Sequence, residues 1–316
     1  MQNSDDGIQA LLFEDDVLMQ QLAKKNTERV VNVASVPQRS PFRYPGGKTW
    51  LVPTLRQWLG SIDARPRDFI ESFAGGGIIS LTVAFEDLAD HITMVESDED
   101  VAAVWETILG RENEWLANRI LTYQLNAENA RATLSKKPES QREHAFHTVL
   151  RNRINHGGIL APGSGFIKTG ENGKGITSRW YPETIARRIR DIKAVRHRIN
   201  FVCGDGLEVM NKCRNNAEAV FFIDPPYTAA GKKAGARLYR HSRLNHEQLF
   251  CTASELAGDF LMTYDNADGI HKLAEKHGFD TQPIAMKNTH HAKMTELLIG
   301  RNLDWVRQQD RRKAER

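Results

Sequence analysis

The chain has 316 residues and a net charge of +3, which is too small a charge to indicate a nucleic-acid partner by itself. Its length suits one large domain or two modest ones with a substantial core. The three cysteines lack CxxC spacing, so we expect reduced thiols and no zinc site. No apolar run reaches membrane-spanning length and the N-terminus has no signal-peptide core, so we expect a cytoplasmic protein without membrane association.

We divide the chain into an N-terminal extension (1–40), a discontinuous core (41–104 and 199–303), an insertion (105–198) and a basic tail (304–316). Within the extension, residues 8–22 predict one amphipathic helix. From residue 68 apolar runs alternate with helical patterns, which predicts an α/β fold with a mostly parallel sheet and a terminal antiparallel hairpin. The predicted strands are Asp68–Phe73, His91–Glu96, Ile199–Cys203, Ala219–Ile223, Asp259–Tyr264, Phe279–Met286 and Glu296–Gly300.

The insertion breaks this rhythm and predicts a helical subdomain with a glycine-rich loop at residues 157–175. Residues 151–200 carry eleven Lys and Arg against three Asp and Glu, so the positive charge is concentrated here. The predicted helices between residues 101 and 198 are Val101–Leu109, Trp115–Leu125, Gln141–Arg151 and Pro182–Arg198.

The most informative motif is DPPY (residues 224–227), which follows the apolar strand Ala219–Ile223. The two prolines end strand pairing, yet their carbonyl oxygens remain hydrogen-bond acceptors. Asp224 adds two more acceptors and Tyr227 adds a flat face. Acceptors beside an aromatic ring suit a planar ligand with an exocyclic amine, although the same residues also suit a plain Pro-Pro turn at a strand end.

A glycine turn and a strand-end acid predict a cofactor site. The first strand runs into FAGGG (residues 73–77) before a helix, which lets a ligand approach the backbone closely. Glu96 ends the next strand, a place where acids commonly bind ribose hydroxyls. Because the glycines do not match GxGxxG, an adenosine compound smaller than a dinucleotide is favoured.

Two other turns are less specific. YPGGK (residues 44–48) lacks the spacing of a P-loop, and its plainest interpretation is a turn before a helix that starts near Thr49. Asp205 follows the third strand, where it either contacts a cofactor base or caps the next helix.

The order of these motifs resembles that of the Dam-like (alpha-class) DNA adenine methyltransferases. The motifs are YPGGK, FAGGG, a strand-end acid, a long helical insertion, a strand-end GD and DPPY. The resemblance covers roughly residues 41–303 and implies a Rossmann-like methyltransferase sheet with a helical target-recognition insert. Ser72 departs from the family where many members have Pro, and Gly206 departs where an aromatic is frequent.

The resemblance implies S-adenosylmethionine as cofactor, no metal, and methyl transfer to the exocyclic 6-amino group of adenine in double-stranded DNA. Asp224 and the Pro225 carbonyl would accept the amine hydrogens and localise its lone pair for direct in-line transfer. The adenine must be flipped out of the duplex to stack on Tyr227. The implied catalytic residues are Asp224, Pro225, Pro226 and Tyr227. The implied cofactor-binding residues are Tyr44, Lys48, Phe73, Gly75, Gly77, Glu96, Asp205 and Asp224.

Basic residues of the insertion and of the loop after DPPY are expected to neutralise DNA phosphates or to read base edges. For any single arginine between residues 187 and 198, a solvated basic helix is the commoner explanation. RNA or a protein amide as substrate, and a binding protein that has lost catalysis, remain alternatives. The resemblance also allows a cognate restriction endonuclease as partner, and the sequence leaves the oligomeric state open. The expected DNA contacts are Arg151, Arg153, Lys168, Arg188, Lys232, Lys233 and Arg237.

Overall fold

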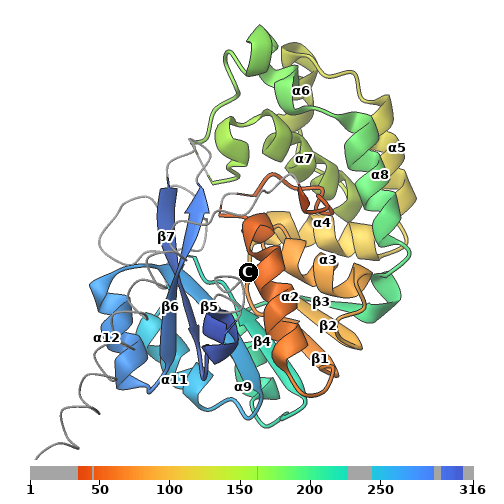
Figure 1. The fold of residues 1–316 in the computed structure, drawn as a ribbon. Helices are drawn as coiled ribbons and strands as arrows, with labels where there is room; N and C mark the ends of the chain where they lie inside the picture. The colour runs from red at the N-terminus through yellow and green to blue at the C-terminus, as the bar shows by residue number, and fades with distance from the viewer. Residues whose placement is uncertain (1–34, 45, 162, 227–243, 288–292, 309–316) are drawn as a thin grey trace, which may run out of the picture.

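The computed structural model describes residues 35–44, 46–161, 163–226, 244–287 and 293–308. One seven-stranded sheet has the order β3-β2-β1-β4-β5-β7-β6 (Figure 1). The first five strands in this order pair in parallel, and β7 runs antiparallel between β5 and β6. The strands are β1 (Asp68–Glu71), β2 (His91–Glu96), β3 (Ile199–Cys203), β4 (Ala219–Ile223), β5 (Asp259–Asp265), β6 (Asp280–Lys287) and β7 (Lys293–Gly300).

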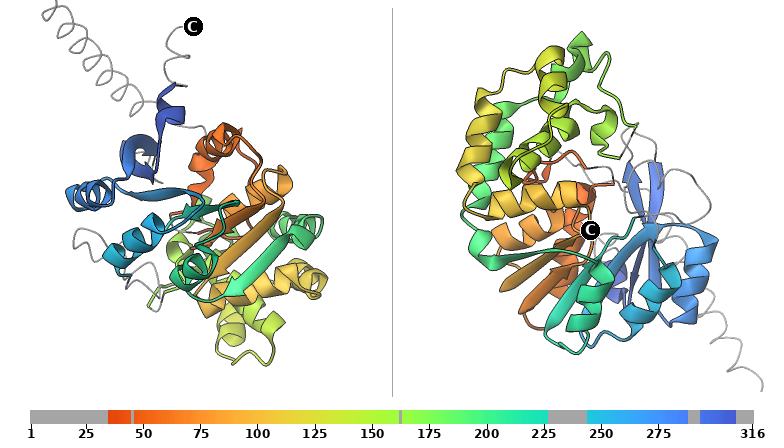
Figure 2. Two further views of the ribbon diagram at one scale, coloured as in Figure 1. Left: turned by 90° about the horizontal axis from the view of Figure 1, so that it is seen from below. Right: turned by 180° about the vertical axis from the view of Figure 1, so that it is seen from behind.

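The mostly parallel sheet with its antiparallel β6–β7 hairpin confirms the predicted α/β fold class. Helices cover both faces of the sheet (Figure 2). The side chains of β4 show why two cores form, because neighbours along a strand point to opposite faces: Phe222 belongs to one hydrophobic cluster and Phe221 to the other. A strand apolar at every position is therefore buried on both sides.

The first hydrophobic cluster lies under α2, α3 and α4, and the second lies under α9, α11 and α12. The helices are α2 (Val52–Ser61), α3 (Ile78–Phe85), α4 (Glu99–Leu109), α5 (Asn113–Thr122), α6 (Ala127–Leu134), α7 (Gln141–Ile154), α8 (Pro182–Ile192), α9 (Gly206–Cys213), α11 (His246–Ser254) and α12 (Asp268–Lys276). Short 3-10 helices are η2 (Lys48–Leu51), η3 (His156–Gly158), η4 (Glu171–Gly173), η5 (Gly175–Arg179) and η6 (Arg196–Arg198). None of the helices described here has both the length and the apolar character needed to cross a bilayer.

The insertion packs on the sheet domain through α4, which contacts α7, while α5 contacts α8 (Figure 1). Ile185, Ile189 and Ile192 form the predicted apolar face of α8 and are fully buried in the first cluster. The insertion thus shares a core with the sheet domain. The helix ends at Ile192, however, and not at Arg198 as predicted, because the next residues form tight turns that lead into β3.

Predicted and observed elements differ mainly at their ends. β2, β3 and β4 have the predicted bounds, whereas β1 ends two residues early, at Glu71, where the chain enters the glycine turn. β7 begins at Lys293 because its pairing with β6 continues to the end of the hairpin. Helix α6 was not predicted. The Asn126 side chain caps its first turn by accepting a hydrogen bond from the Asn129 N–H.

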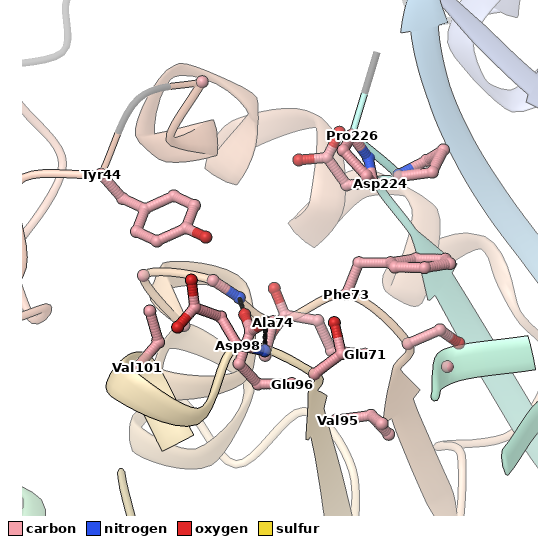
Figure 3. A pocket seen from close by; sticks show the side chains of 18 of the residues that line it. Tyr44, Glu71, Phe73, Ala74, Val95, Glu96, Asp98, Val101, Asp224 and Pro226 are labelled. Atoms are coloured by element: carbon pink, nitrogen blue, oxygen red, sulfur yellow. Dashed lines mark hydrogen bonds between the residues drawn. The ribbon is translucent and has the colours of Figure 1, made fainter. Parts of the chain in front are cut away.

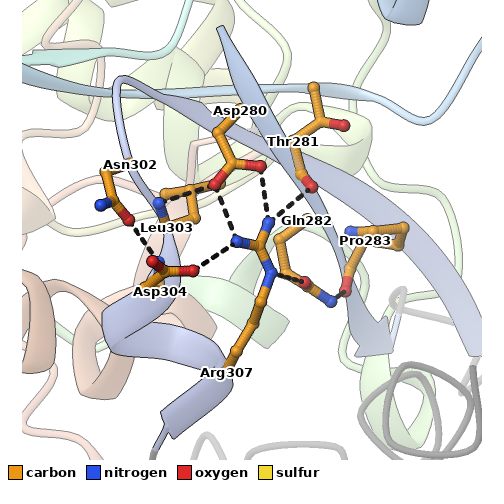
Figure 4. A network of polar contacts seen from close by, with 8 residues as sticks. All are labelled: Asp280, Thr281, Gln282, Pro283, Asn302, Leu303, Asp304 and Arg307. Atoms are coloured by element: carbon orange, nitrogen blue, oxygen red, sulfur yellow. Dashed lines mark hydrogen bonds and ion pairs between the residues drawn. The ribbon is translucent and has the colours of Figure 1, made fainter. Parts of the chain in front are cut away.

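The beginning of the predicted basic tail belongs to the fold. Arg307 forms a two-pronged contact with Asp280, with Nη2 2.6 Å from Oδ1 and Nη1 2.9 Å from Oδ2 (Figure 4). The same Asp280 carboxylate accepts a hydrogen bond from the Leu303 N–H. These contacts fasten the C-terminal segment to β6, an edge strand on which Pro283 is tolerated.

Candidate functional site

A cavity of about 300 Å³ opens at the carboxyl ends of the central parallel strands (Figure 3). Open α/β sheets bind ligands at this edge, where the strand order reverses. Tyr227 lies outside the described residues. The cavity is lined by every other predicted catalytic or cofactor-binding residue: Tyr44, Lys48, Phe73, Gly75, Gly77, Glu96, Asp205, Asp224, Pro225 and Pro226.

The glycine turn between β1 and α3 has no room for side chains. Gly75 and Gly77 adopt positive φ values of 47° and 63°, a region that L side chains rarely occupy. A Cβ on Gly77 would lie 2.6 Å from the Trp105 ring, and one on Gly75 would lie 2.6 Å from the Tyr44 ring. The Tyr44 ring therefore packs directly on the turn, and its hydroxyl points into the space that Phe73 borders on the other side (Figure 3).

Glu96 is held by backbone N–H groups on both of its oxygens. Oε2 accepts from Gly75 at 2.9 Å and Oε1 accepts from Asp98 at 2.8 Å. Burial raises the pKa of this carboxyl to about 7. Because a carboxylate oxygen has two acceptor sites, Glu96 retains capacity for ligand hydroxyls.

Asp224 is oriented from two elements. Its Oδ1 lies 2.9 Å from Nζ of Lys48 and accepts a hydrogen bond from the Thr263 hydroxyl at 2.8 Å. Thr263 lies beside Asp224 because β4 and β5 pair the two preceding residues, Ile223 and Met262. The lysine is only 3% exposed and also donates to the Gly46 carbonyl at 3.1 Å. The carboxylate thus has a fixed direction within the cavity.

Two further carboxyl groups near Asp224 were not predicted. Glu296 of β7 lies 3.6 Å from Nζ of Lys48, and burial raises its pKa to about 7, with Asp224 and Asp265 adding to the rise. Glu71 ends β1 and lines the cavity, and burial raises its pKa to about 8. Glu71 was not recognised as a strand-end acid like Glu96, because the predicted strand continued to Phe73. Glu296 had no such sequence signal.

Tyr264 of β5 belongs to the same neighbourhood. Its hydroxyl is hydrogen bonded to Nδ1 of His246 at 2.8 Å, and burial, with a smaller effect of Asp224, raises its pKa. The side chain therefore remains a neutral phenol beside the Asp224 carboxylate.

Asp205 caps α9 and also lines the cavity, so the structure is compatible with a helix cap and with a contact to a cofactor base. Its Oδ1 accepts from the Leu207 N–H at 2.7 Å. The two departures from the family pattern meet here, because a Cβ on Gly206 would lie 2.1 Å from the Ser72 carbonyl oxygen. Glycine is thus required at residue 206 by the path of the backbone at residue 72.

The predicted DNA contacts have different environments. Lys168 is exposed, whereas Nη1 of Arg151 lies 3.5 Å from Oδ2 of Asp100. Arg153 is only 4% exposed and donates to the Pro41 carbonyl, and its contact with DNA stays a prediction. Arg188 is half-buried and donates to the Ser40 carbonyl at 2.9 Å. The other three predicted DNA contacts lie outside the described part of the chain: Lys232, Lys233 and Arg237.

No family model matches the chain, and no curated protein matches it either. Solved structures match at low similarity. PH1948 from Pyrococcus horikoshii is 12% identical, with 89% of this chain and 96% of that chain covered and a TM-score of 0.37. The rRNA methyltransferase AviRa from Streptomyces viridochromogenes is 12% identical, with 81% and 85% covered and a TM-score of 0.36. A precorrin-6y C5,15-methyltransferase from Geobacter metallireducens is 10% identical, with 78% and 86% covered and a TM-score of 0.33.

These values describe a distant likeness of fold. The fold class stated above rests on the strand order, and the activity has to be argued from the site.

Proposed function

We propose that this chain is an S-adenosylmethionine-dependent DNA methyltransferase that modifies the exocyclic 6-amino group of adenine in double-stranded DNA. The proposal rests on one observation: Asp224 and Pro225 line the same cavity as the glycine turn and Glu96. Acceptors suited to an amine thus lie beside groups suited to an adenosine compound.

The residues around the glycine turn fit such a cofactor. Gly75 and Gly77 have no side chains to cover their backbone, and the rings of Tyr44 and Trp105 pack on Gly75 and Gly77, respectively. Glu96 offers acceptor sites for ribose hydroxyls, and Asp205, which follows β3, lines the same cavity. S-adenosylmethionine, when bound there, would supply a methyl group activated by its sulfonium.

At the other side of the cavity, Asp224 and the Pro225 carbonyl would accept the two hydrogens of the adenine amine. This pairing opposes delocalisation of the nitrogen lone pair into the ring and makes the nitrogen a better nucleophile. Lys48 and Thr263 fix the carboxylate in advance, so little reorganisation is needed as positive charge builds on the nitrogen. The same carboxylate is placed to take up the proton that the methylated amine must lose.

Replacing Asp224 with asparagine tests the proposal, because this change keeps the shape and removes the charge. We expect methyl transfer to fall by at least ~100-fold, while cofactor binding and DNA binding persist. Labelled methyl transfer should be measured on duplex DNA, RNA and protein, with modified adenines mapped in the DNA. Asp63→Asn, at an exposed loop position, is the matched control. Label on RNA or protein with none on DNA, or unchanged turnover in the Asp224 variant, would contradict the proposal.

A further inference from the structure

Four arginine side chains gather where the insertion meets the segment before Tyr44. We name them the arginine cluster: Arg43, Arg153 of α7, Arg179 of η5 and Arg188 of α8. Arg153 and Arg188 donate to the carbonyls of Pro41 and Ser40, respectively. Asn152 holds the Arg43 backbone, since its side chain accepts from the Arg43 N–H and donates to the Arg43 carbonyl, each at 2.8 Å.

The cluster carries far more positive than negative charge. Burial, together with smaller effects of the nearby Arg188, Arg43 and Arg179, lowers the pKa of Arg153 to about 9. Burial also lowers the pKa of Arg43, and Arg179 adds to that effect. Within the described residues, Glu171 is the carboxylate that opposes these charges, and it is already ion-paired with Arg179.

The cluster also contains donors that have no acceptor. Nε of Arg153, Nε of Arg188 and Nη1 of Arg43 are buried and make no hydrogen bond in the described structure. A buried donor without a hydrogen-bond partner costs about 1–3 kcal/mol, and more when it is charged. Excess positive charge and unpaired donors at one place favour the binding of an anion with several acceptor oxygens.

We propose that the arginine cluster binds a phosphate of the nucleic-acid backbone at the rim of the cavity. This inference rests on the proposed function. Guanidinium groups match the oxygens of a phosphate in a two-pronged geometry. Arg43, Arg179 and Arg188 are partly exposed and contact the phosphate, whereas the buried Arg153 contributes its charge from below. Tyr181, exposed to 47%, adds an aromatic surface beside them.

The position of the cluster connects the phosphate to the reaction. Arg43 directly precedes Tyr44, which lines the cavity. Gly158 lines the cavity too, and it packs so closely on Arg43 that a Cβ there would lie 2.4 Å from the Arg43 carbonyl oxygen. A phosphate held by the cluster therefore belongs to the stretch of backbone next to the nucleotide presented to Asp224.

The test compares two doubly substituted proteins of equal charge. Arg43→Gln/Arg179→Gln removes two partly exposed members of the cluster. Arg142→Gln/Arg190→Gln removes two arginines that pair with Glu112 and Glu114 elsewhere on the insertion.

The first measurement is thermal unfolding with inorganic phosphate at constant ionic strength. We expect a saturable rise of Tm for the wild type and for the control variant, and none for the cluster variant. The second is the salt dependence of binding to duplex DNA. In the cluster variant, the slope of log K against log salt should become shallower by about 1 for each phosphate that the substituted arginines no longer neutralise.

A phosphate effect on Tm that is equal in all three proteins, or absent from all three, overturns the anion site. A wild-type salt slope in the cluster variant overturns the proposal that the bound phosphate belongs to nucleic acid. The cluster would then serve to hold residues 40–43 in place. If phosphate and DNA bind through the cluster but no methyl group is transferred, the proposed function fails while this site stands.

Discussion

Replacing Glu296 with glutamine should remove one contribution to the pH dependence of the protein's stability. The Glu296 side chain is buried, with Oε1 3.6 Å from Nζ of Lys48 and Oε2 without a hydrogen-bond partner among the described residues. The charged groups that face it are Lys48, Asp224 and Asp265, the last of which is its register partner on β5. Burial outweighs the attraction to Lys48, so the pKa of Glu296 rises to about 7.

The sign of the effect follows from this rise. Because the folded-state pKa lies above the unfolded value of 4.5, the carboxyl contributes stability that is complete below pH 4.5 and is lost as pH rises through about 7. A difference of that size corresponds to about 3 kcal/mol at most. Glutamine does not titrate, so the free energy of unfolding of the variant should rise relative to the wild type by up to about 3 kcal/mol between pH 5 and 8.

Urea unfolding of both proteins across this pH range measures the difference directly. Glu71 and Glu96 also titrate there, but they are present in both proteins and cancel. Glu218→Gln is the matched control, since its side chain is 66% exposed, and its difference from wild type should stay within about 0.5 kcal/mol. Parallel stability curves for the wild type and the Glu296 variant would refute the reasoning.

Two substitutions test the packing around the site and at the C-terminus. Gly206→Ala should destabilise the protein by about 1–3 kcal/mol, because the new Cβ would meet the backbone oxygen of Ser72 at 2.1 Å. Gly269→Ala, in an open helical position, should stabilise it by about 0.5–1 kcal/mol. Arg307→Ala should cost about 1–2 kcal/mol by removing the two-pronged, partly exposed contact with Asp280, and an unchanged urea midpoint would contradict that estimate.

The sequence predicted the elements whose signals are local. The bounds of β2, β3 and β4 match because each is a short apolar run with clear breaks. The cavity could also be predicted, since Glu96 ends one parallel strand and Asp224 follows another, and the carboxyl ends of parallel strands meet at one edge of the sheet. The end of α8 was wrong because Val195 and Ile199 continue the helical spacing, although Ile199 already belongs to β3.

Features that depend on tertiary pairing could not be predicted. Glu296 reaches Lys48 because β7 inserts between β5 and β6, and no local pattern encodes that insertion. Arg153 is a basic residue of a type that is usually exposed, yet packing under residues 40–43 buries its side chain. Both side chains are charged groups in the interior, where residue type is a poor guide to burial.

The carboxyl groups of the cavity give the proposed cofactor a further consequence. Burial raises the pKa of Glu71 to about 8 and that of Glu96 to about 7, and both residues line the cavity. A cation that binds beside them favours their ionised forms and lowers both pKa values. Binding of S-adenosylmethionine near pH 7 should therefore release protons, and its affinity should increase as pH rises toward 8.

Calorimetric titrations in two buffers with different ionisation enthalpies give the number of protons released. S-adenosylhomocysteine, which has the same adenosine but lacks the sulfonium charge, should release fewer protons than S-adenosylmethionine. Glu71→Gln should reduce the difference between the two ligands, since it removes one of the titrating groups. Equal proton release by both ligands would mean that the ligand charge does not reach these carboxyl groups. The carboxyl groups of Glu71 and Glu96 would then interact with the adenosine hydroxyls alone.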